Sequence, residues 1–243
     1  MTAAPVGFQC PDCVAAGAQV TQQAQRAISQ DRPLVSWGII AVCAVVFVLQ
    51  FALGSDQVIT YFGMWPVAIA SDGEWYRLVT SVFLHAGILH IAFNMYVLLV
   101  LGPPLERALG HLRFLVLFLL AGLGGAVASF AFSAPTTISV GASGAIFGIM
   151  GALVVAGRRL RWDITQVVVL IAINIVIGFV FGSGIDWRAH LGGLVTGAAV
   201  AALMVLPAHD TRRRYVEVGG VVVVLALLVA GAVLRAGQLA LVG

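Results

Sequence analysis

Seven apolar stretches, each about as long as a membrane-spanning helix, divide this sequence of 243 residues. They cover residues 34–53, 83–101, 112–132, 143–157, 164–182, 187–206 and 216–234. A helix needs about 20 predominantly apolar residues to cross the roughly 30 Å hydrocarbon core of a bilayer, and only the fourth stretch is short for this task. Because a helix satisfies its own backbone hydrogen bonds in lipid, the pattern predicts an all-α polytopic membrane protein.

The composition excludes an ordinary soluble domain. Hydrophobic residues make up 61% of the chain and charged residues only 9%, whereas soluble domains carry about 25% charged residues. The formal charge of +3 is spread over the loops, so we expect the lipid bilayer and no nucleic acid as a partner. More than thirty mostly polar residues precede the first apolar stretch, which predicts a signal anchor and not a cleavable signal peptide.

The placement of the arginines predicts the orientation in the membrane. If all seven stretches span, ten arginines share one side and three lie on the other. The ten are Arg26, Arg32, Arg107, Arg113, Arg158, Arg159, Arg161, Arg212, Arg213 and Arg214, and the three are Arg77, Arg188 and Arg235. Cytoplasmic loops carry the excess of positive charge. We therefore expect a multi-pass protein of a bacterial cell membrane, with a cytoplasmic N-terminus and an external C-terminus.

The same pattern divides the chain into three parts. These are a cytoplasmic N-terminal segment (1–33), a six-helix core (34–206) with an external loop (54–82), and an Arg-rich loop plus a seventh helix (207–243). The first part contains Cys10-Pro11-Asp12-Cys13. A tetrahedral zinc site needs two more ligands, and the nearby chain offers none. We expect no metal and no cofactor, and we interpret Cys10 and Cys13 as an incomplete cysteine-rich segment.

Four polar residues lie in the external halves of the predicted spans. They are His90, Asn94, Ser143 and His190. Polar side chains at membrane depth are costly and usually functional. Ser143 begins its helix, so its backbone N–H belongs to the unpaired donors of the first turn. A nucleophile there would have an N–H beside a developing oxyanion. The alternative is a serine that caps the helix or lets helices approach.

His190 is the candidate general base for Ser143. Gly193 and Gly197 lie on its helix face, and Gly144 follows Ser143. Small residues on two helices let their backbones come close in a membrane, which a Ser–His hydrogen bond requires. Since no acidic residue accompanies them within the spans, the sequence predicts a dyad and not a triad. The alternative is a histidine that serves packing alone.

Three further side chains complete the predicted site. His90 and Asn94 are four residues apart and project from one helix face, so they can form an oxyanion hole with the Ser143 N–H; hydrogen bonds between helices are the alternative. Phe147 shares the face of Ser143 and can stack on the imidazole of His190. His85 lies off the face of His90, and we assign it a structural role.

Over roughly residues 60–206, the sequence resembles the rhomboid family of intramembrane serine proteases. The resemblance rests on Glu74-Trp75-Tyr76-Arg77, His85, His90-x-x-x-Asn94, Glu106-x-x-x-Gly110, Gly141-x-Ser143-Gly144 and Ala189-His190-x-x-Gly193-x-x-x-Gly197. It implies a rhomboid-like six-helix bundle plus a seventh C-terminal transmembrane helix. It also implies Ser143 as nucleophile, His190 as base, His90, Asn94 and the Ser143 N–H as oxyanion hole, Phe147 against the imidazole, and a structural role for Arg77.

The expected function is hydrolysis of peptide bonds in or next to the transmembrane segments of single-pass or multi-pass membrane proteins. Two other classes of function stay open. A catalytically silent rhomboid-like protein would bind membrane proteins without cleaving them, and we would expect its dyad to be broken. A transporter or channel would carry charged residues in mid-span or broken inverted repeats. The sequence does not predict the oligomeric state.

Overall fold

The computed structural model describes residues 2–3, 8–9, 32–180, 184–206 and 213–241. Seven long helices dominate it: α2 (Leu34–Leu53), α6 (Ile88–Leu109), α7 (His111–Phe132), α8 (Ser143–Leu160), α9 (Thr165–Val180), α10 (Trp187–Val205) and α11 (Arg213–Ala240). Near the N-terminus, β1 (Thr2–Ala3) and β2 (Phe8–Gln9) form a two-residue antiparallel pair. Each predicted span corresponds to one long helix, so the expected all-α polytopic fold is confirmed.

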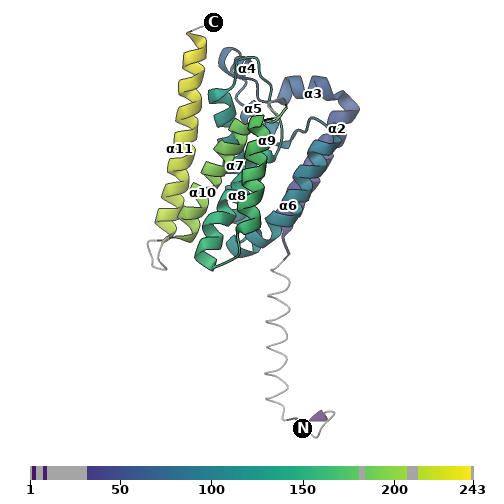
Figure 1. The fold of residues 1–243 in the computed structure, drawn as a ribbon, viewed down its shortest axis with the longest axis vertical. Helices are drawn as coiled ribbons and strands as arrows, with labels where there is room; N and C mark the ends of the chain where they lie inside the picture. The colour runs from purple at the N-terminus through teal and green to yellow at the C-terminus, as the bar shows by residue number, and fades with distance from the viewer. Residues whose placement is uncertain (1, 4–7, 10–31, 181–183, 207–212, 242–243) are drawn as a thin grey trace.

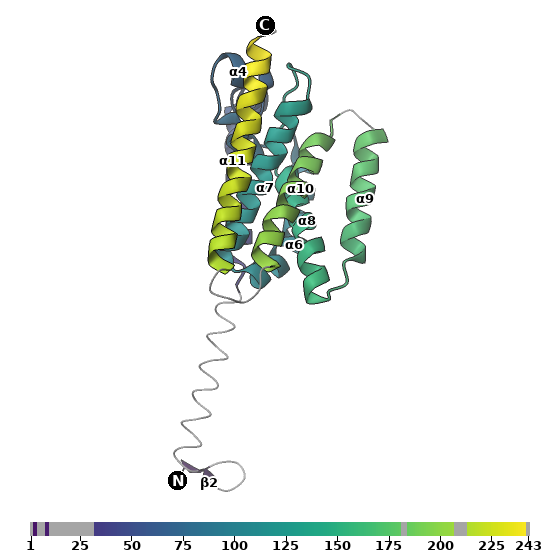
Figure 2. The same ribbon diagram turned by 90° about the vertical axis from the view of Figure 1, so that its left-hand side faces the viewer.

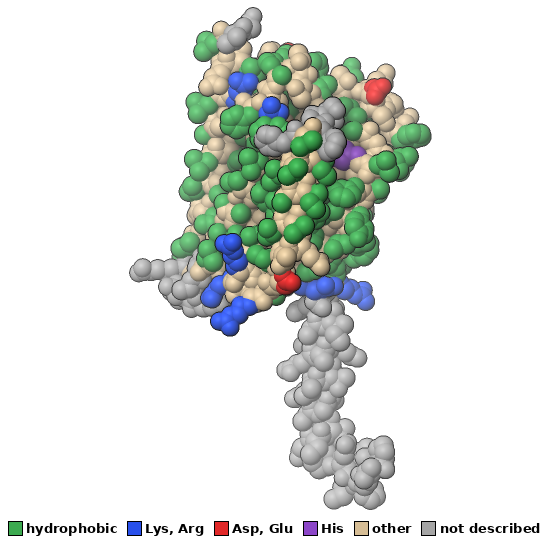
Figure 3. Space-filling view, in the orientation of Figure 1, with side chains coloured by type: hydrophobic (Ala, Val, Ile, Leu, Met, Phe, Trp, Pro, Cys, Tyr) green, Lys and Arg blue, Asp and Glu red, His purple; other side chains and the backbone are tan. Residues whose placement is uncertain are grey.

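Six of these helices are long and apolar enough to cross a membrane, and α9 is a shorter apolar helix. The short span is therefore the fifth and not the fourth, because α8 continues beyond the predicted end at residue 157 to Leu160. Apolar side chains cover most of the face between the two ends of the molecule that Figure 3 shows. A surface of this kind fits lipid better than water, as expected for an integral multi-pass membrane protein.

The second span differs from its predicted bounds of 83–101. The chain forms a short 3-10 helix, η1 (Ser81–Phe83), before α6 begins at Ile88. Helix α6 then continues to Leu109 through Pro103 and Pro104. The predicted start was too early because the apolar residues Phe83 and Leu84 precede the helix, and the predicted end was too early because the helix continues through two prolines.

The predicted external loop contains most of the remaining helical structure. It holds α3 (Ser55–Phe62), α4 (Pro66–Ser71) and α5 (Arg77–Thr80). The guanidinium of Arg77, which is only 3% exposed, donates to the carbonyl oxygens of Thr60 at 2.6 Å and Gly63 at 3.0 Å, and to Glu74 Oε2 at 2.6 Å. Arg77 therefore folds this loop back on itself, in keeping with a structural role.

Helices α7, α8 and α10 form the centre of the molecule (Figure 1). Helix α10 packs against both α8 and α7, and the fully buried rings of Phe114 and Phe118 fill the space along α7. Helices α9 and α11 lie at opposite edges of this centre (Figure 2). The start of α8 and the start of α10 thus meet inside the bundle.

Candidate active site

Ser143 is the first residue of α8, and the chain turns sharply just before it. Gly141 has φ +132°, a conformation that side chains rarely adopt. Its N–H donates to Ser81 O at 2.9 Å. A Cβ at Gly141 would stand 2.8 Å from the His90 ring, so only glycine fits between that ring and the entry to α8.

The backbone at the start of α8 leaves donors without helical partners. The first helical hydrogen bond runs from Ile146 N to Ala142 O at 3.0 Å, and no side chain caps this end. The N–H of Ser143 therefore precedes the helical hydrogen-bond ladder. With the positive end of the helix dipole, this arrangement favours negative charge beside the Ser143 hydroxyl.

His190 lies in the first turn of α10 and faces Ser143. Its Nε2 is 2.9 Å from Ser143 Oγ, within hydrogen-bond range. The imidazole is 7% exposed. Among the residues that the structure describes, no group pairs with its Nδ1. When Nε2 accepts a hydrogen bond from the Ser143 hydroxyl, the N–H of the neutral imidazole is at Nδ1.

The ring of Phe147 stacks on the imidazole of His190. The two ring centroids are 4.2 Å apart and their planes differ by 9°. Phe147 is itself buried at 3% exposure, so the phenyl ring cannot move away without disturbing the core. This contact fixes the plane of the imidazole from the α8 side.

Glycine contacts bring the backbones of α8 and α10 together. A Cβ at Gly193 would stand 1.9 Å from Gly144 O, and one at Gly197 would stand 2.2 Å from Gly148 O. Atoms cannot approach that closely, so neither position has room for any side chain. This close packing is what allows Ser143 and His190 to meet.

His90 lies beside Ser143, whereas Asn94 is engaged elsewhere. Ala86 N donates to His90 Nδ1 at 3.3 Å, which leaves Nε2 as the N–H of a neutral ring. A Cβ built on Gly141 would stand 2.8 Å from His90 Nε2 and 3.7 Å from Ser143 Oγ. Both side-chain atoms therefore lie next to the same point of the backbone. Asn94 Nδ2 donates to His90 O at 2.9 Å, so at least one of its two N–H groups serves its own helix.

Sequence reasoning missed Gln50, a buried polar residue in the first span. Gln50 Nε2 donates to the backbone oxygen of His85 at 2.6 Å, and Gln50 Oε1 accepts from the backbone N–H of His85 at 3.2 Å. The His85 ring is fully buried and lies edge-on to the ring of His90 at 5.2 Å. Burial, with a smaller effect of His90, lowers the pKa of His85 to about 4. The signal was available, because a glutamine inside an apolar span is costly.

Asp186 was missed as well, because only acidic residues within the spans were considered. It stands just before α10 and is the N-cap of that helix, with Oδ1 accepting from Ala189 N at 3.1 Å. Its Oδ2 accepts from Ser139 Oγ at 2.6 Å and also from Ser129 Oγ. An aspartate directly before an apolar helix is a typical N-cap signal, so the sequence contained this information.

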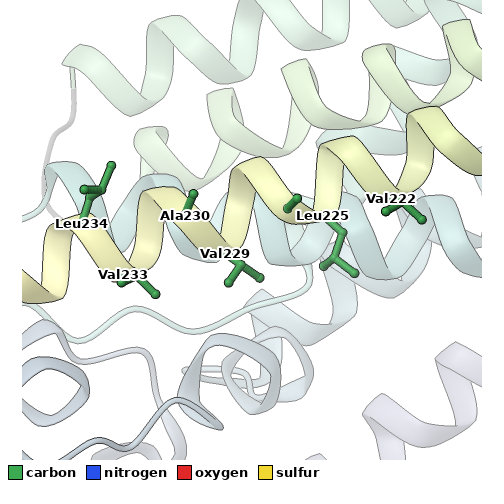
Figure 4. Close-up of a pocket in the computed structure, with 7 residues that line it drawn as sticks. Val222, Leu225, Val229, Ala230, Val233 and Leu234 are labelled. Atoms are coloured by element: carbon green, nitrogen blue, oxygen red, sulfur yellow. The ribbon is translucent and has the colours of Figure 1, made fainter.

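Two other features lie apart from this chemistry. A shallow apolar pocket is lined only by residues of α11 and offers no reactive group (Figure 4). In the part of the chain that the structure describes, no three His, Cys, Asp or Glu side chains converge as metal ligands. Cys10 and Cys13 lie outside the described residues.

Comparison with known proteins gives one family. The profile of the Rhomboid domain matches residues 72–207. Rhomboid protease GluP of Bacillus subtilis is 40% identical over 184 residues, which cover 72% of this chain and 36% of GluP. Putative rhomboid protease YdcA of the same organism is 32% identical over 194 residues, covering 75% of this chain and 92% of YdcA. Rhomboid protease AarA of Providencia stuartii is 28% identical over 218 residues, covering 73% and 77%.

The lengths of the relatives differ widely. The chain spans 36% of GluP and 47% and 37% of two rhomboid-like proteins of Arabidopsis thaliana. Several relatives therefore contain long regions that have no counterpart in the matched part of this chain.

Proposed function

Because this chain belongs to the rhomboid family, we propose that it is an intramembrane serine endopeptidase. It would cleave peptide bonds in or next to the transmembrane segments of other membrane proteins. One observation carries the proposal: a serine hydroxyl and an imidazole nitrogen, 2.9 Å apart, lie between two helices of an otherwise apolar bundle. The similarity to GluP and AarA, which are rhomboid proteases, supports the same activity.

In the proposed reaction, Ser143 Oγ attacks the carbonyl carbon of the substrate while His190 Nε2 takes its proton. The tetrahedral intermediate collapses, and His190 returns that proton to the leaving amine. An ester to Ser143 remains, and water hydrolyses it with His190 again as the base. The stacked ring of Phe147 would hold the imidazole in the plane that both transfers need.

Negative charge develops on the carbonyl oxygen during the attack. We assign its stabilisation to the Ser143 N–H, the His90 Nε2–H and the Asn94 amide. Two contacts support this assignment: the Ser143 N–H precedes the helical ladder, and Ala86 N leaves His90 Nε2 as a donor. The amide of Asn94 would have to turn from His90 O or use its second N–H. Removing one such donor costs about 10²–10³ in kcat.

The proposal includes the setting of the site in the membrane. Residues 34–206 would form the protease core, with loop 54–82 external, and residues 207–243 would add a seventh helix. The N-terminus would be cytoplasmic and the C-terminus external. The arginines support this orientation, because most of the basic side chains visible in Figure 3 lie at the lower end of the molecule and fewer at the upper end. Helix α11 runs from the lower end to the upper end (Figure 1).

We expect Ser143→Ala and His190→Ala each to lower cleavage of a model transmembrane substrate by about 10³-fold or more, since either change removes a reacting group. Purified protein in proteoliposomes would be tested, with labelling of Ser143 by a fluorophosphonate probe as the second readout. Ser71→Ala is the matched control, because Ser71 is exposed at the end of α4. Full activity of purified Ser143→Ala would overturn the proposal.

The alternative is a catalytically silent rhomboid-like protein that binds membrane proteins. It shares the fold, so the two are separated by chemistry. The silent protein would neither cleave substrate nor react with the fluorophosphonate probe, whereas the protease does both. The intact pair of Ser143 and His190 favours the protease.

A further inference from the structure

We propose that Asp186 is a positioning residue for the pair of Ser143 and His190. Its carboxylate joins the start of α10, which carries His190, to the linker that enters α8 at Ser143. This inference rests on the proposed function, since it concerns the geometry of that reaction. It assigns Asp186 no contact with the substrate.

One half of the link is within α10. Asp186 Oδ1 accepts from Ala189 N at 3.1 Å, and Asp186 O accepts from His190 N at 3.2 Å. Asp186 therefore accepts hydrogen bonds from the backbone N–H groups of Ala189 and His190 in the first turn of α10. An Asp at this position stabilises a helix start relative to alanine, and here the turn that it stabilises carries the base.

The other half of the link reaches the nucleophile. Asp186 Oδ2 accepts from Ser139 Oγ at 2.6 Å, and Ser139 lies four residues before Ser143. Ser139 is itself held in place, because its backbone N and O pair with Met64 at 2.9 and 3.0 Å. Ser129 of α7 donates to the same carboxylate oxygen. The carboxylate thus gathers three segments at one end of the bundle.

These contacts bracket the reacting side chains. In α10, His190 lies between Asp186, four residues earlier, and Gly193, three residues later. In the other segment, Ser143 lies between Ser139 and Gly144. The Gly144–Gly193 contact sets how near the helices come, and the carboxylate sets the position of their outer ends. With only one of these two contacts, the helices could still tilt about it.

The geometry separates this role from that of a triad aspartate. In a triad, the carboxylate accepts a hydrogen bond from His Nδ1. Here both carboxylate oxygens accept from other groups, and His190 Nδ1 has no partner among the described residues. Asp186 would therefore position the imidazole through the backbone of α10, without a hydrogen bond to the ring.

The test compares Asp186→Ala with Asp186→Asn in the full chain in proteoliposomes. We expect Asp186→Ala to lower kcat and the rate of fluorophosphonate labelling of Ser143 by about 10- to 100-fold, with KM within about twofold, because small displacements of reacting groups have effects of that size. Asp186→Asn should restore most of both rates, since asparagine caps helices as well as aspartate does and can pair with serine hydroxyls. Equal losses in the two variants would overturn the positioning role.

Two serine variants test the route. Ser139→Ala should lower kcat in the same way as Asp186→Ala, and the double variant should lose little more, because both changes break one link. Ser129→Ala is the matched control: it removes a hydroxyl from the same oxygen without touching the linker, and should have the smaller effect. If Ser129→Ala and Ser139→Ala lose equal activity, the linker is not the route and the proposal fails.

The outcomes also separate this inference from the proposed function. If the wild-type protein neither cleaves nor reacts with the probe, the protease proposal fails. If the wild-type protein does both and folded Asp186→Ala keeps its kcat and labelling rate, only the role of Asp186 fails. Thermal unfolding establishes that each variant is folded. Should Asp186→Ala not fold, unchanged kcat and labelling in Ser139→Ala would still overturn the inference.

Discussion

At the scale of single residues, the candidate site depends on two glycines of α10 that have no side chain. The space beside Gly193 and Gly197 is filled by the backbone oxygens of α8, so the absence of a Cβ decides the distance between the helices. Glycine inside a helix costs roughly 0.5–1 kcal/mol relative to alanine. The chain accepts that cost where it brings His190 to Ser143.

Gly193→Ala should therefore impair both folding and activity. The new methyl group would overlap Gly144 O, which is backbone and cannot turn away, so we expect a loss of about 1–3 kcal/mol in the free energy of unfolding and a larger loss in cleavage. Unfolding and proteolysis assays on purified protein check this. Gly219→Ala is the control, because nothing lies within 4 Å of a Cβ there; equal losses in both variants would contradict the argument.

His85 predicts a dependence of stability on pH. It lies outside the spanning helices, and burial lowers its pKa from 6.5 to about 4. The folded state therefore prefers the neutral ring, while the unfolded state takes up a proton below pH 6.5. The contribution of His85 is complete above pH 6.5 and is lost as the pH falls toward 4, by up to about 3 kcal/mol.

The matching measurement is the free energy of unfolding of the detergent-solubilised protein between pH 7 and pH 4. His85→Leu removes the titrating group, so its stability should fall less steeply over this range than that of the wild-type protein. Other groups titrate in both proteins, and only the difference between the two curves reports on His85. Parallel curves would rule out this explanation.

At the scale of elements, α11 is attached to the core at both ends. Near its start, Glu217 pairs with Arg113 of α7 through two hydrogen bonds of 2.6 and 2.7 Å. Near its other end, Ala232 packs in a buried cluster with Met64 and Ile69 of the predicted external loop. The seventh helix therefore supports the loop that also holds Ser139 through Met64.

The two attachments should differ in strength. Ala232→Leu would overfill a position that is 3% exposed, at a cost of about 1–3 kcal/mol. Glu217→Gln should cost less than about 1 kcal/mol, because the Arg113 side chain is 39% exposed. Ala230→Leu is the matched control, since Ala230 faces outward on the same helix. The free energy of unfolding should fall most in Ala232→Leu, less in Glu217→Gln and least in Ala230→Leu. A different order would contradict the packing of α11.

At the scale of the whole molecule, charge separates the two ends. Arg107, Arg113, Arg158 and Arg159 belong to one end of the bundle, and Arg77 and Arg188 to the other. Seven long helices run between these ends, so the start of α2 and the end of α11 lie at opposite ends of the bundle (Figure 1). Together with the excess of arginine on cytoplasmic sides, this arrangement underlies the proposed orientation.

Accessible tags test the orientation directly. A tag after Gly243 should be cleaved by protease added outside intact cells, whereas a tag inserted between Arg161 and Thr165 should be reached only after permeabilisation. The physical reason is that the arginine-rich side is held in the cytoplasm. A tag pattern of the reverse kind, or two tags on the same side, would contradict the proposed topology.

Much of this arrangement is readable from the chain alone. The lengths of the apolar runs predict the spanning helices, because each run must satisfy its backbone within lipid. The rare polar side chains in those runs, Ser143 and His190 among them, predict the candidate site, because their burial is costly. The start of α6 was not predictable, since hydropathy does not distinguish η1 from the helix that follows.

Only the tertiary structure decided which distant groups meet. Asp186 reads as a helix cap, and its contacts with Ser129 and Ser139 depend on how three segments converge. Gln50 reads as an isolated polar residue until it pairs with the backbone of His85. The spans and their polar residues follow from local composition. The distance of 2.9 Å between Ser143 Oγ and His190 Nε2 follows from the close packing of α8 and α10, and the sequence alone does not show which helices pack together.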